Sequence, residues 1–276
     1  MGRLIDSFKA YITDDATALA TDIATGKTAY VSGGKVTGAG YFPAMMQYDG
    51  STGYYGSTPA YTGNKVTVVA RFKISSFTGN TLAAIQRAKA GVSKYTRLYV
   101  YVGSSDNSNT DFRNKVICDV YNSTGTVICL LVSTVDVADG AEHTVMASFD
   151  GDLGIAQLIV DGVDVDDVSA TSRVAPTTGT LATGSTAHSV GSANNTSLVH
   201  GSNIAIGFCG YADAYLTNWS DFMDSTGNPI KQDEAIWGNS GWGSQPLFWN
   251  EHGDMVNNKG SAGAMTRNGT IVVAPA

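Results

Sequence analysis

Charge is scarce in this sequence, and one acidic residue type is almost missing. Charged residues make up 15% of the 276 positions, and only three of the 24 acidic residues are Glu: Glu142, Glu234 and Glu251. Because Glu favours helices and Asp favours turns and caps, this imbalance argues against a helical bundle. The 17 Lys and Arg leave a net charge of −7, which excludes a nucleic-acid binder that works by neutralising phosphates.

Cysteine and long apolar runs are also rare. Three Cys are too few for a disulfide framework. No stretch approaches the roughly 18 apolar residues of a membrane span. No apolar run follows the basic start of the chain. We therefore expect no membrane segment and no signal peptide, and a chain that is made in the cytosol.

Glycine and alternating apolar residues are abundant instead. Gly occupies 32 positions, well above a usual share of about 7%. From Val66 to Ile74 every second residue is apolar, whereas Thr67, Arg71 and Lys73 occupy the other face, as in a β-strand. The same alternation recurs in six further segments: Arg97–Val102, Lys115–Tyr121, Val127–Val132, Thr144–Phe149, Ala156–Val160 and Ile204–Phe208.

Turn signals rich in Gly, Asp and Asn separate these segments, at 104–109, 138–140, 150–152 and 161–162. Many short strands divided in this way predict an all-β antiparallel sandwich. The polar stretch 169–202 is expected to be a long surface loop.

Two of the cysteines lie in a predicted hairpin around a turn at 122–125. If Tyr121 pairs with Thr126, Cys118 lies opposite Cys129. Either a cross-strand disulfide or two reduced thiols that pack as small hydrophobic residues fits this pairing, and reduced thiols suit a cytosolic origin better. Cys209 is expected in the core.

The first 40 residues differ from the rest. Residues 14–25 can form one short helix with an Asp cap, ended by Gly26, and the pattern over 30–37 predicts a small hairpin. Such a segment is too short to hold a core of its own. We therefore expect an N-terminal arm over 1–40 that packs on something else, followed by one domain over 41–276. The segment 270–273 is expected to pair near 41–48.

Several motifs resemble laminin-G-like domains of the concanavalin A-like class, and they occur in that family's order. The motifs are Tyr48-Asp-Gly-Ser-Thr-Gly-Tyr-Tyr, the strand 65–74, Asp139-Gly-Ala-Glu-His-Thr-Val-Met-Ala-Ser-Phe-Asp-Gly, Leu158-Ile-Val-Asp-Gly-Val, His188-Ser-Val-Gly-Ser and 204–215. The resemblance implies a concanavalin A-like (laminin-G-like) antiparallel jelly roll over 41–276, behind the short arm.

Other pieces resemble bacteriophage virion proteins. The stretch 22–38 is similar to an anchor repeat of tail and head-fibre proteins, and 222–230, 242–249 and 258–269 are similar to the C-terminal ends of laminin-G-like domains in phage structural proteins. The resemblance implies a non-enzymatic virion protein (capsid decoration, head fibre or tail-associated) that forms homo-oligomers and binds capsid or tail proteins. The anchoring residues that it implies are Ile23, Tyr30, Val31 and Val36.

A polysaccharide hydrolase is the alternative that some jelly rolls suggest. It needs two carboxylates held about 5–10 Å apart, one of which donates a proton. The three Glu are scattered, and Asp164 and Asp166 lie in a predicted hairpin, where a solvated turn explains them better. We therefore expect no enzyme activity.

A Ca²⁺ site is a further alternative, because Asp161, Asp164, Asp166 and Asp167 could supply oxygen ligands. Their spacing does not match an EF-hand, so no cofactor is expected. The four His show no paired spacing that would suit zinc, and His143 is expected to cap a strand.

Carbohydrate binding is the alternative that names specific residues, since sugars bind to aromatic faces beside polar side chains. The candidate residues are Trp242 and Trp249, with Trp237 nearby, and Tyr54 and Tyr55 in an early turn. A host-surface glycan is the ligand that this arrangement suggests. The competing interpretation is that these aromatic residues close one end of the sandwich.

Overall fold

The structure, a computed structural model, divides the chain into two compact units, Met1–Pro43 and Ala44–Ala276. It describes residues 28–31, 34–37, 45–48, 53–56, 63–74, 81–91, 94–102, 112–181, 187–191, 204–221, 248–250, 260–261, 265–268 and 272–273. Among these residues, no helix has the length and apolar character that crossing a membrane requires.

The first unit contains an antiparallel hairpin of two strands, β1 (Thr28–Val31) and β2 (Gly34–Thr37). Its register runs from Thr28 opposite Thr37 to Val31 opposite Gly34. The predicted hairpin is therefore confirmed. The predicted helix over 14–25 lies outside the described residues.

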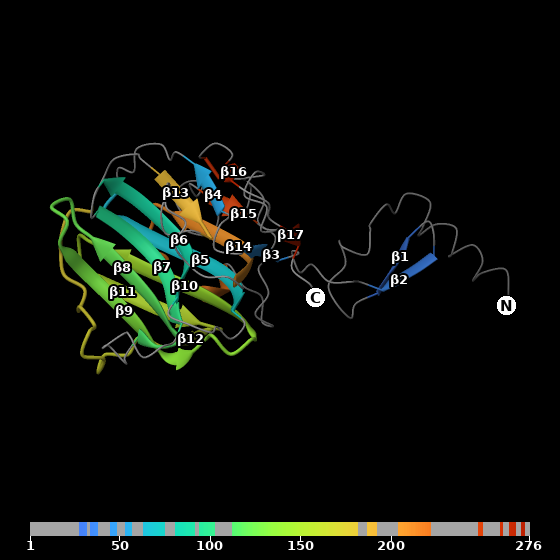
Figure 1. The fold of residues 1–276 in the computed structure, drawn as a ribbon, viewed down its shortest axis with the longest axis horizontal. Coiled ribbons are helices and arrows are strands. Elements are labelled where there is room, and N and C mark those ends of the chain that lie inside the picture. The colour runs from blue at the N-terminus through green and yellow to red at the C-terminus, as the bar shows by residue number, and fades with distance from the viewer. Residues whose placement is uncertain are drawn as a thin grey trace, which may run out of the picture. The chain divides into compact units, whose positions relative to one another are not determined.

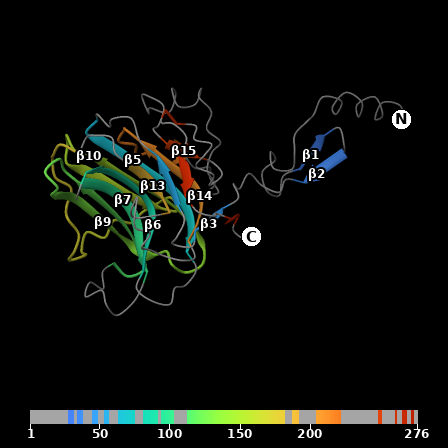
Figure 2. The same cartoon turned by 45° about the horizontal axis from the view of Figure 1, so that its top comes forward.

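The second unit is a sandwich of two antiparallel sheets, drawn as two layers of arrows in Figure 1 and, turned, in Figure 2. The first sheet has eight strands, in the order β12-β11-β10-β5-β14-β3-β17, with β15 also paired to β14. Its strands are β3 (Met46–Tyr48), β5 (Lys65–Ile74), β10 (Glu142–Asp150), β11 (Ile155–Val160), β12 (Val163–Asp164), β14 (Ile204–Ala212), β15 (Phe248–Asn250) and β17 (Val272–Val273).

The second sheet has seven strands, in the order β16-β4-β13-β6-β7-β8-β9. They are β4 (Gly53–Gly56), β6 (Thr81–Gly91), β7 (Lys94–Val102), β8 (Lys115–Tyr121), β9 (Val127–Asp136), β13 (Ala187–Val190) and β16 (Thr266–Asn268). The chain passes back and forth between the two sheets. After β5 it forms β6 to β9 in the second sheet, and it then returns to the first sheet, where β10 and later β14 pair with β5.

The C-terminal strand β17 joins the first sheet. Val272 pairs with Gln47 and Val273 with Met46 of β3, which confirms the expected pairing of 270–273 with 41–48.

The main core lies between the sheets and follows the predicted alternation. Val66, Val68, Ala70, Phe72 and Ile74 of β5 are all buried in it. The opposite sheet contributes every second side chain of its strands to the same core, among them Leu98, Val100, Val116, Cys118 and Leu131. Alternation predicted this face because successive residues of a strand point to opposite sides.

A second apolar cluster covers the outer face of the first sheet. Its members are Val69, Met146, Ile159, Phe208, Ala212 and Leu216. The segment 213–221, which ends in the short 3-10 helix Trp219–Asp221, is held to this face by buried hydroxyls. Thr67 Oγ1 contacts the Ala214 carbonyl oxygen at 2.7 Å and accepts a hydrogen bond from the Leu216 amide at 3.1 Å. Ser148 Oγ donates to the Leu216 carbonyl oxygen at 2.6 Å.

The structure corrects the predicted pairing of the cysteines. The register places Cys118 opposite Leu131 and Val120 opposite Cys129, because Tyr121 pairs with Val127 and not Thr126, and an irregularity between Val120 and Tyr121 shifts the pairing by one more residue. Cys118 and Cys129 are therefore diagonal neighbours, and both are buried free thiols, as is Cys209.

The predicted loop over 169–202 is also wrong in part, because β13 lies within it. Its first portion runs along the edge of β9. Leu130 and Val174 exchange backbone hydrogen bonds of 3.0 and 3.1 Å, and the Thr177 amide donates to the Ile128 carbonyl oxygen at 3.0 Å. This segment covers an edge that would otherwise offer unpaired backbone groups to another chain.

Candidate functional site

The predicted carbohydrate-binding aromatic residues do not share one strand or one sheet. Tyr54 and Tyr55 lie in β4, a strand and not the expected turn, and belong to the second sheet. Trp249 lies in β15, opposite Gly210 in the first sheet. Trp242 and Trp237 are outside the described residues. Since adjacent residues of a strand occupy opposite faces, Tyr54 and Tyr55 also belong to different faces of their sheet.

Tyr55 belongs to a polar row that crosses the second sheet. The register aligns Tyr55 with Ser189, Ser189 with Arg87, Arg87 with Arg97, and Arg97 with Asp119. We call these five residues the outer row. The neighbouring positions Val120 and Val190 lie in the core, so the outer row belongs to the face that points away from it.

The outer row carries two positive charges and one negative charge on five adjacent strands. Asp119 and Ser189, the two members whose side chains are described, are both buried. The sequence gives no local sign of this row, because the alignment depends on the pairing partner of each strand.

The carboxylates of the Asp-rich hairpin have separate partners. Asp161 accepts a hydrogen bond from the Thr144 amide (2.8 Å) and contacts His143, while Asp166 forms a two-pronged ion pair with Arg173 (Nη2–Oδ2 2.6 Å). Asp167 Oδ1 accepts from Ser169 Oγ at 2.6 Å. Each carboxylate faces a different partner, and the described residues contain no group of three or more His, Cys, Asp or Glu suited to a metal ion. Asp166 is half-buried in its ion pair, which corrects its expected position in a solvated turn.

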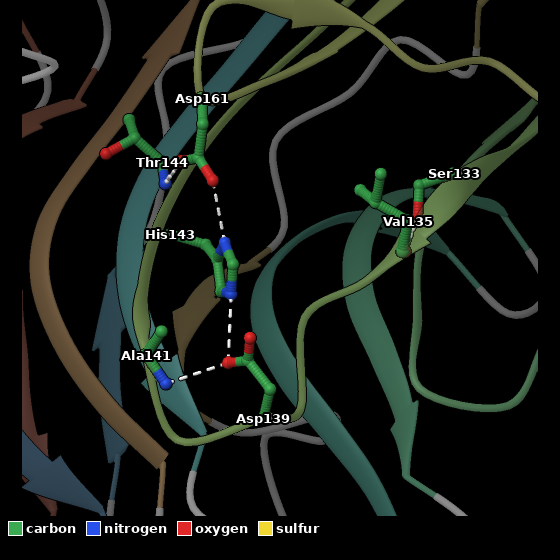
Figure 3. A network of polar contacts seen from close by, with 7 residues as sticks. All are labelled: Ser133, Val135, Asp139, Ala141, His143, Thr144 and Asp161. Atoms are coloured by element: carbon green, nitrogen blue, oxygen red, sulfur yellow. Dashed lines mark hydrogen bonds and ion pairs between the residues drawn. The ribbon is translucent and has the colours of Figure 1, made fainter.

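His143 lies at the start of β10 between two carboxylates, as Figure 3 shows. Its Nδ1 is 2.7 Å from Asp161 Oδ2, and its Nε2 is 3.1 Å from Asp139 Oδ1. The hydrogen bond with Asp161 raises the pKa of His143, partial burial opposes this, and Asp139 adds to the rise. The Ala141 amide, 2.7 Å from Asp139 Oδ1, and then His143 lower the pKa of Asp139.

Two carboxylates of β10 are tied to cations of β5. Glu142 forms an ion pair with the buried Arg71 of β5. Desolvation lowers the pKa of Arg71, and the charge of Glu142 opposes that change. Asp150 is buried and accepts from Lys65 Nζ at 3.0 Å and from the amides of Asp152 and Leu153. Glu234 and Glu251 lie outside the described residues.

The predicted anchoring residues fall on the N-terminal hairpin where the structure describes them. Tyr30 and Val31 belong to β1 and Val36 to β2, with Tyr30 opposite Lys35 and Ala29 opposite Val36. Ile23 lies outside the described residues.

Sequence reasoning missed the partners of His143, although local signals for them exist. Asp139 precedes His143 by four residues, in a turn that contains Gly140. Asp161 opens an Asp-Gly turn in which both residues have positive φ, 51° and 83°. An Asp-Gly pair is typical of the tight turn between two strands, which brings Asp161 back beside the start of β10.

No protein family and no curated protein matches the sequence. Among solved structures, a candidate carbohydrate-binding protein from Bacteroides ovatus is similar, with a TM-score of 0.53 at 13% identity over 88% of this chain and 63% of that one. A heptameric SAP-like pentraxin from Limulus polyphemus (TM-score 0.41, 12% identity, 64% of this chain and 78% of that one) and the LG4-5 domains of the mouse laminin α1 chain (0.41, 14%, 80% and 50%) are more distant.

The chain spans less than two thirds of the length of the Bacteroides structure. At this identity the likeness concerns the fold, and it agrees with the two antiparallel sheets and the alternating path of the chain between them. The second unit is therefore an all-β antiparallel jelly-roll sandwich.

Proposed function

We propose that this protein is a non-enzymatic structural protein of a virion, attached through its first unit and displaying the lectin-like sandwich. The observation that carries the proposal is the division of the chain after Pro43, with a separate hairpin in the first unit. That hairpin coincides with the stretch that is similar to a phage anchor repeat. A four-residue strand pair buries little apolar surface by itself, so docking on a neighbouring protein would supply the missing contacts.

Truncation tests the attachment. We expect residues 44–276 to keep the β-sheet circular dichroism and the cooperative thermal transition of the full chain, and to lose cosedimentation with particles. As a matched pair, Val36→Asp in the hairpin should weaken attachment, whereas Val163→Asp, at an exposed position of the sandwich, should not. Unchanged attachment of residues 44–276 would contradict the proposal.

The absence of enzyme activity belongs to the same proposal. Glu142, Asp150 and Asp166 form ion pairs with Arg71, Lys65 and Arg173, so each of these carboxylates already serves as a structural partner. Purified protein should release no reducing ends from polysaccharide. Release that survives repurification would contradict this part of the proposal.

Glycan binding by the sandwich is a second candidate function, compatible with the first. The Bacteroides structure of similar fold is a candidate carbohydrate-binding protein, and the register aligns the aromatic Tyr55 with the strands that carry Arg87 and Arg97, which favours this function. Tyr55 and Trp249 lie in different sheets. We expect Tyr55→Ala, Trp242→Ala or Trp249→Ala to abolish binding on a glycan array, and unchanged binding in all three variants would exclude these residues as the site. Absence of any bound glycan would exclude this function.

A further inference from the structure

We propose that His143, Asp139 and Asp161 form a proton-operated clasp that closes one end of the first sheet when the imidazole is doubly protonated and opens when it loses a proton. The three residues come from three elements: the turn 138–141, the start of β10, and the turn between β11 and β12. Figure 3 shows the ring between the two carboxylates.

The geometry itself requires the second proton. A neutral imidazole has one N–H donor and one acceptor nitrogen. Here both nitrogens face carboxylate oxygens, at 2.7 and 3.1 Å, and an ionised carboxylate can only accept. Loss of either proton therefore leaves a nitrogen lone pair against an oxygen lone pair, and one contact turns from attractive to repulsive.

The two carboxylates face opposite nitrogens of the ring, so the three side chains do not converge on one point.

The charged groups that affect the pKa of His143 are these two carboxylates. From β5 it meets Phe72, with ring centroids 6.3 Å apart, and the adjacent Arg71 is already paired with Glu142. The imidazole ring is mostly buried, with 12% of the side chain exposed, whereas both carboxylates are about half exposed. Solvent can therefore deliver the proton, and the two carboxylates retain it against the opposing effect of burial.

Asp139 is the contact that opens first. Asp161 lies closer to the ring, is the larger cause of the raised pKa of His143 and also accepts from the Thr144 amide. Asp139 is held by the Ala141 amide and by His143 alone, within a turn that is also tied to β5 by the Gly140 amide and the Ile74 carbonyl oxygen (3.0 Å). Deprotonation is expected to free the turn 138–141 and to leave the Asp161 turn in place.

The sign of the pH dependence follows from the two shifts. The pKa of His143 is raised on folding, so its contribution to stability is complete below the ordinary histidine pKa and is lost as the pH rises through the raised value. The pKa of Asp139 is lowered, so its contribution is complete above the ordinary aspartate pKa and is lost as the pH falls through the lowered value. The clasp is closed between these limits.

Nuclear magnetic resonance titration of the full chain tests the clasp, with the His143 ring signals assigned by their loss in His143→Gln. We expect both ring nitrogens to be protonated at pH 6.5, with a midpoint above that of the unfolded chain. The isosteric variants Asp139→Asn and Asp161→Asn should lower the midpoint, Asp161→Asn by more. A midpoint at or below the unfolded value, or one equal in all three proteins, would overturn the proposal.

Amide exchange in the unmodified chain gives a second readout that does not depend on any variant folding. The Ala141 amide donates to Asp139, and the Asp152 amide donates to Asp150 in a turn without histidine, so Asp152 is the matched reference. Above the His143 midpoint, exchange of Ala141 relative to Asp152 should rise roughly three- to tenfold, as for the loss of one supporting hydrogen bond. A constant ratio across the midpoint would overturn the proposal.

Discussion

Burial is the largest influence on the acidity of two cysteines, Cys129 and Cys209. Desolvation raises the pKa of Cys209 to about 12, and that of Cys129 also lies well above the ordinary thiol value. Since the thiolate is the reactive form, neither group can attack a reagent from inside the core.

We therefore predict that no thiol of the native protein reacts with a disulfide reagent such as 5,5′-dithiobis(2-nitrobenzoate), and that all three react after denaturation. Absorbance of the released thiolate measures both numbers. Rapid reaction of any thiol in the native protein would contradict the packing of β8, β9 and β14 described above.

A buried hydroxyl gives a second prediction for a single residue. Thr67→Val should reduce the free energy of unfolding by about 1–3 kcal/mol, because it leaves the Leu216 amide and the Ala214 carbonyl oxygen without this partner. Thr134→Val, at an exposed position of the same residue type in β9, should change it by less than about 0.5 kcal/mol. Urea denaturation of both variants measures the difference; equal effects would show that the segment 213–221 is not held as described.

Residue-level predictions from sequence succeed where the signal is local. The apolar face of β5 is encoded by alternation within ten residues and is confirmed from Val66 to Ile74. The predicted position of Cys118 opposite Cys129 is wrong because Tyr121 pairs one residue further along β9 than expected, and an irregularity then shifts the register once more. The burial of Thr67 and Arg71 could not be predicted either, since it depends on a segment about 150 residues away and on an ion pair across strands.

Among the elements, strand β6 shows most clearly how tertiary context overrides local preference. Its sequence, Thr-Leu-Ala-Ala-Ile-Gln-Arg-Ala-Lys-Ala-Gly, is rich in residues that favour helices, yet it forms eleven residues of strand between β13 and β7. Gln86 adds a link that no pattern predicts, because its side-chain amide donates across the core to the Val69 and Gly210 carbonyl oxygens, at 2.8 and 3.2 Å.

Two turn glycines, Gly140 and Gly154, allow the cost of backbone strain to be compared with the cost of a steric clash. Gly140 and Gly154 both have positive φ, 85° and 65°, but a Cβ on Gly140 would meet nothing within 4 Å. A Cβ on Gly154 would lie 2.7 Å from the Thr178 amide nitrogen. Gly140→Ala should therefore cost about 1 kcal/mol and Gly154→Ala about 3 kcal/mol or more. Thermal denaturation of the pair measures this, and similar losses would contradict the contact between 151–154 and 177–179.

At the scale of the whole molecule, the order of strands and turns predicted the fold class. The signal is strong because short strands of alternating apolar residues, separated by turns, recur along most of the chain. The candidate site was harder to predict. Tyr55, Ser189, Arg87, Arg97 and Asp119 are brought into one row only by the register of five strands. The sequence likewise does not show that the strands of Tyr55 and Trp249 join different sheets.

Electron cryomicroscopy of intact particles tests the central claim most directly. The account predicts a density for the jelly roll outside the particle, joined to a capsid or tail protein through residues 1–43. Absence of the protein from purified particles, or attachment through the sandwich with the N-terminal hairpin free, would contradict it.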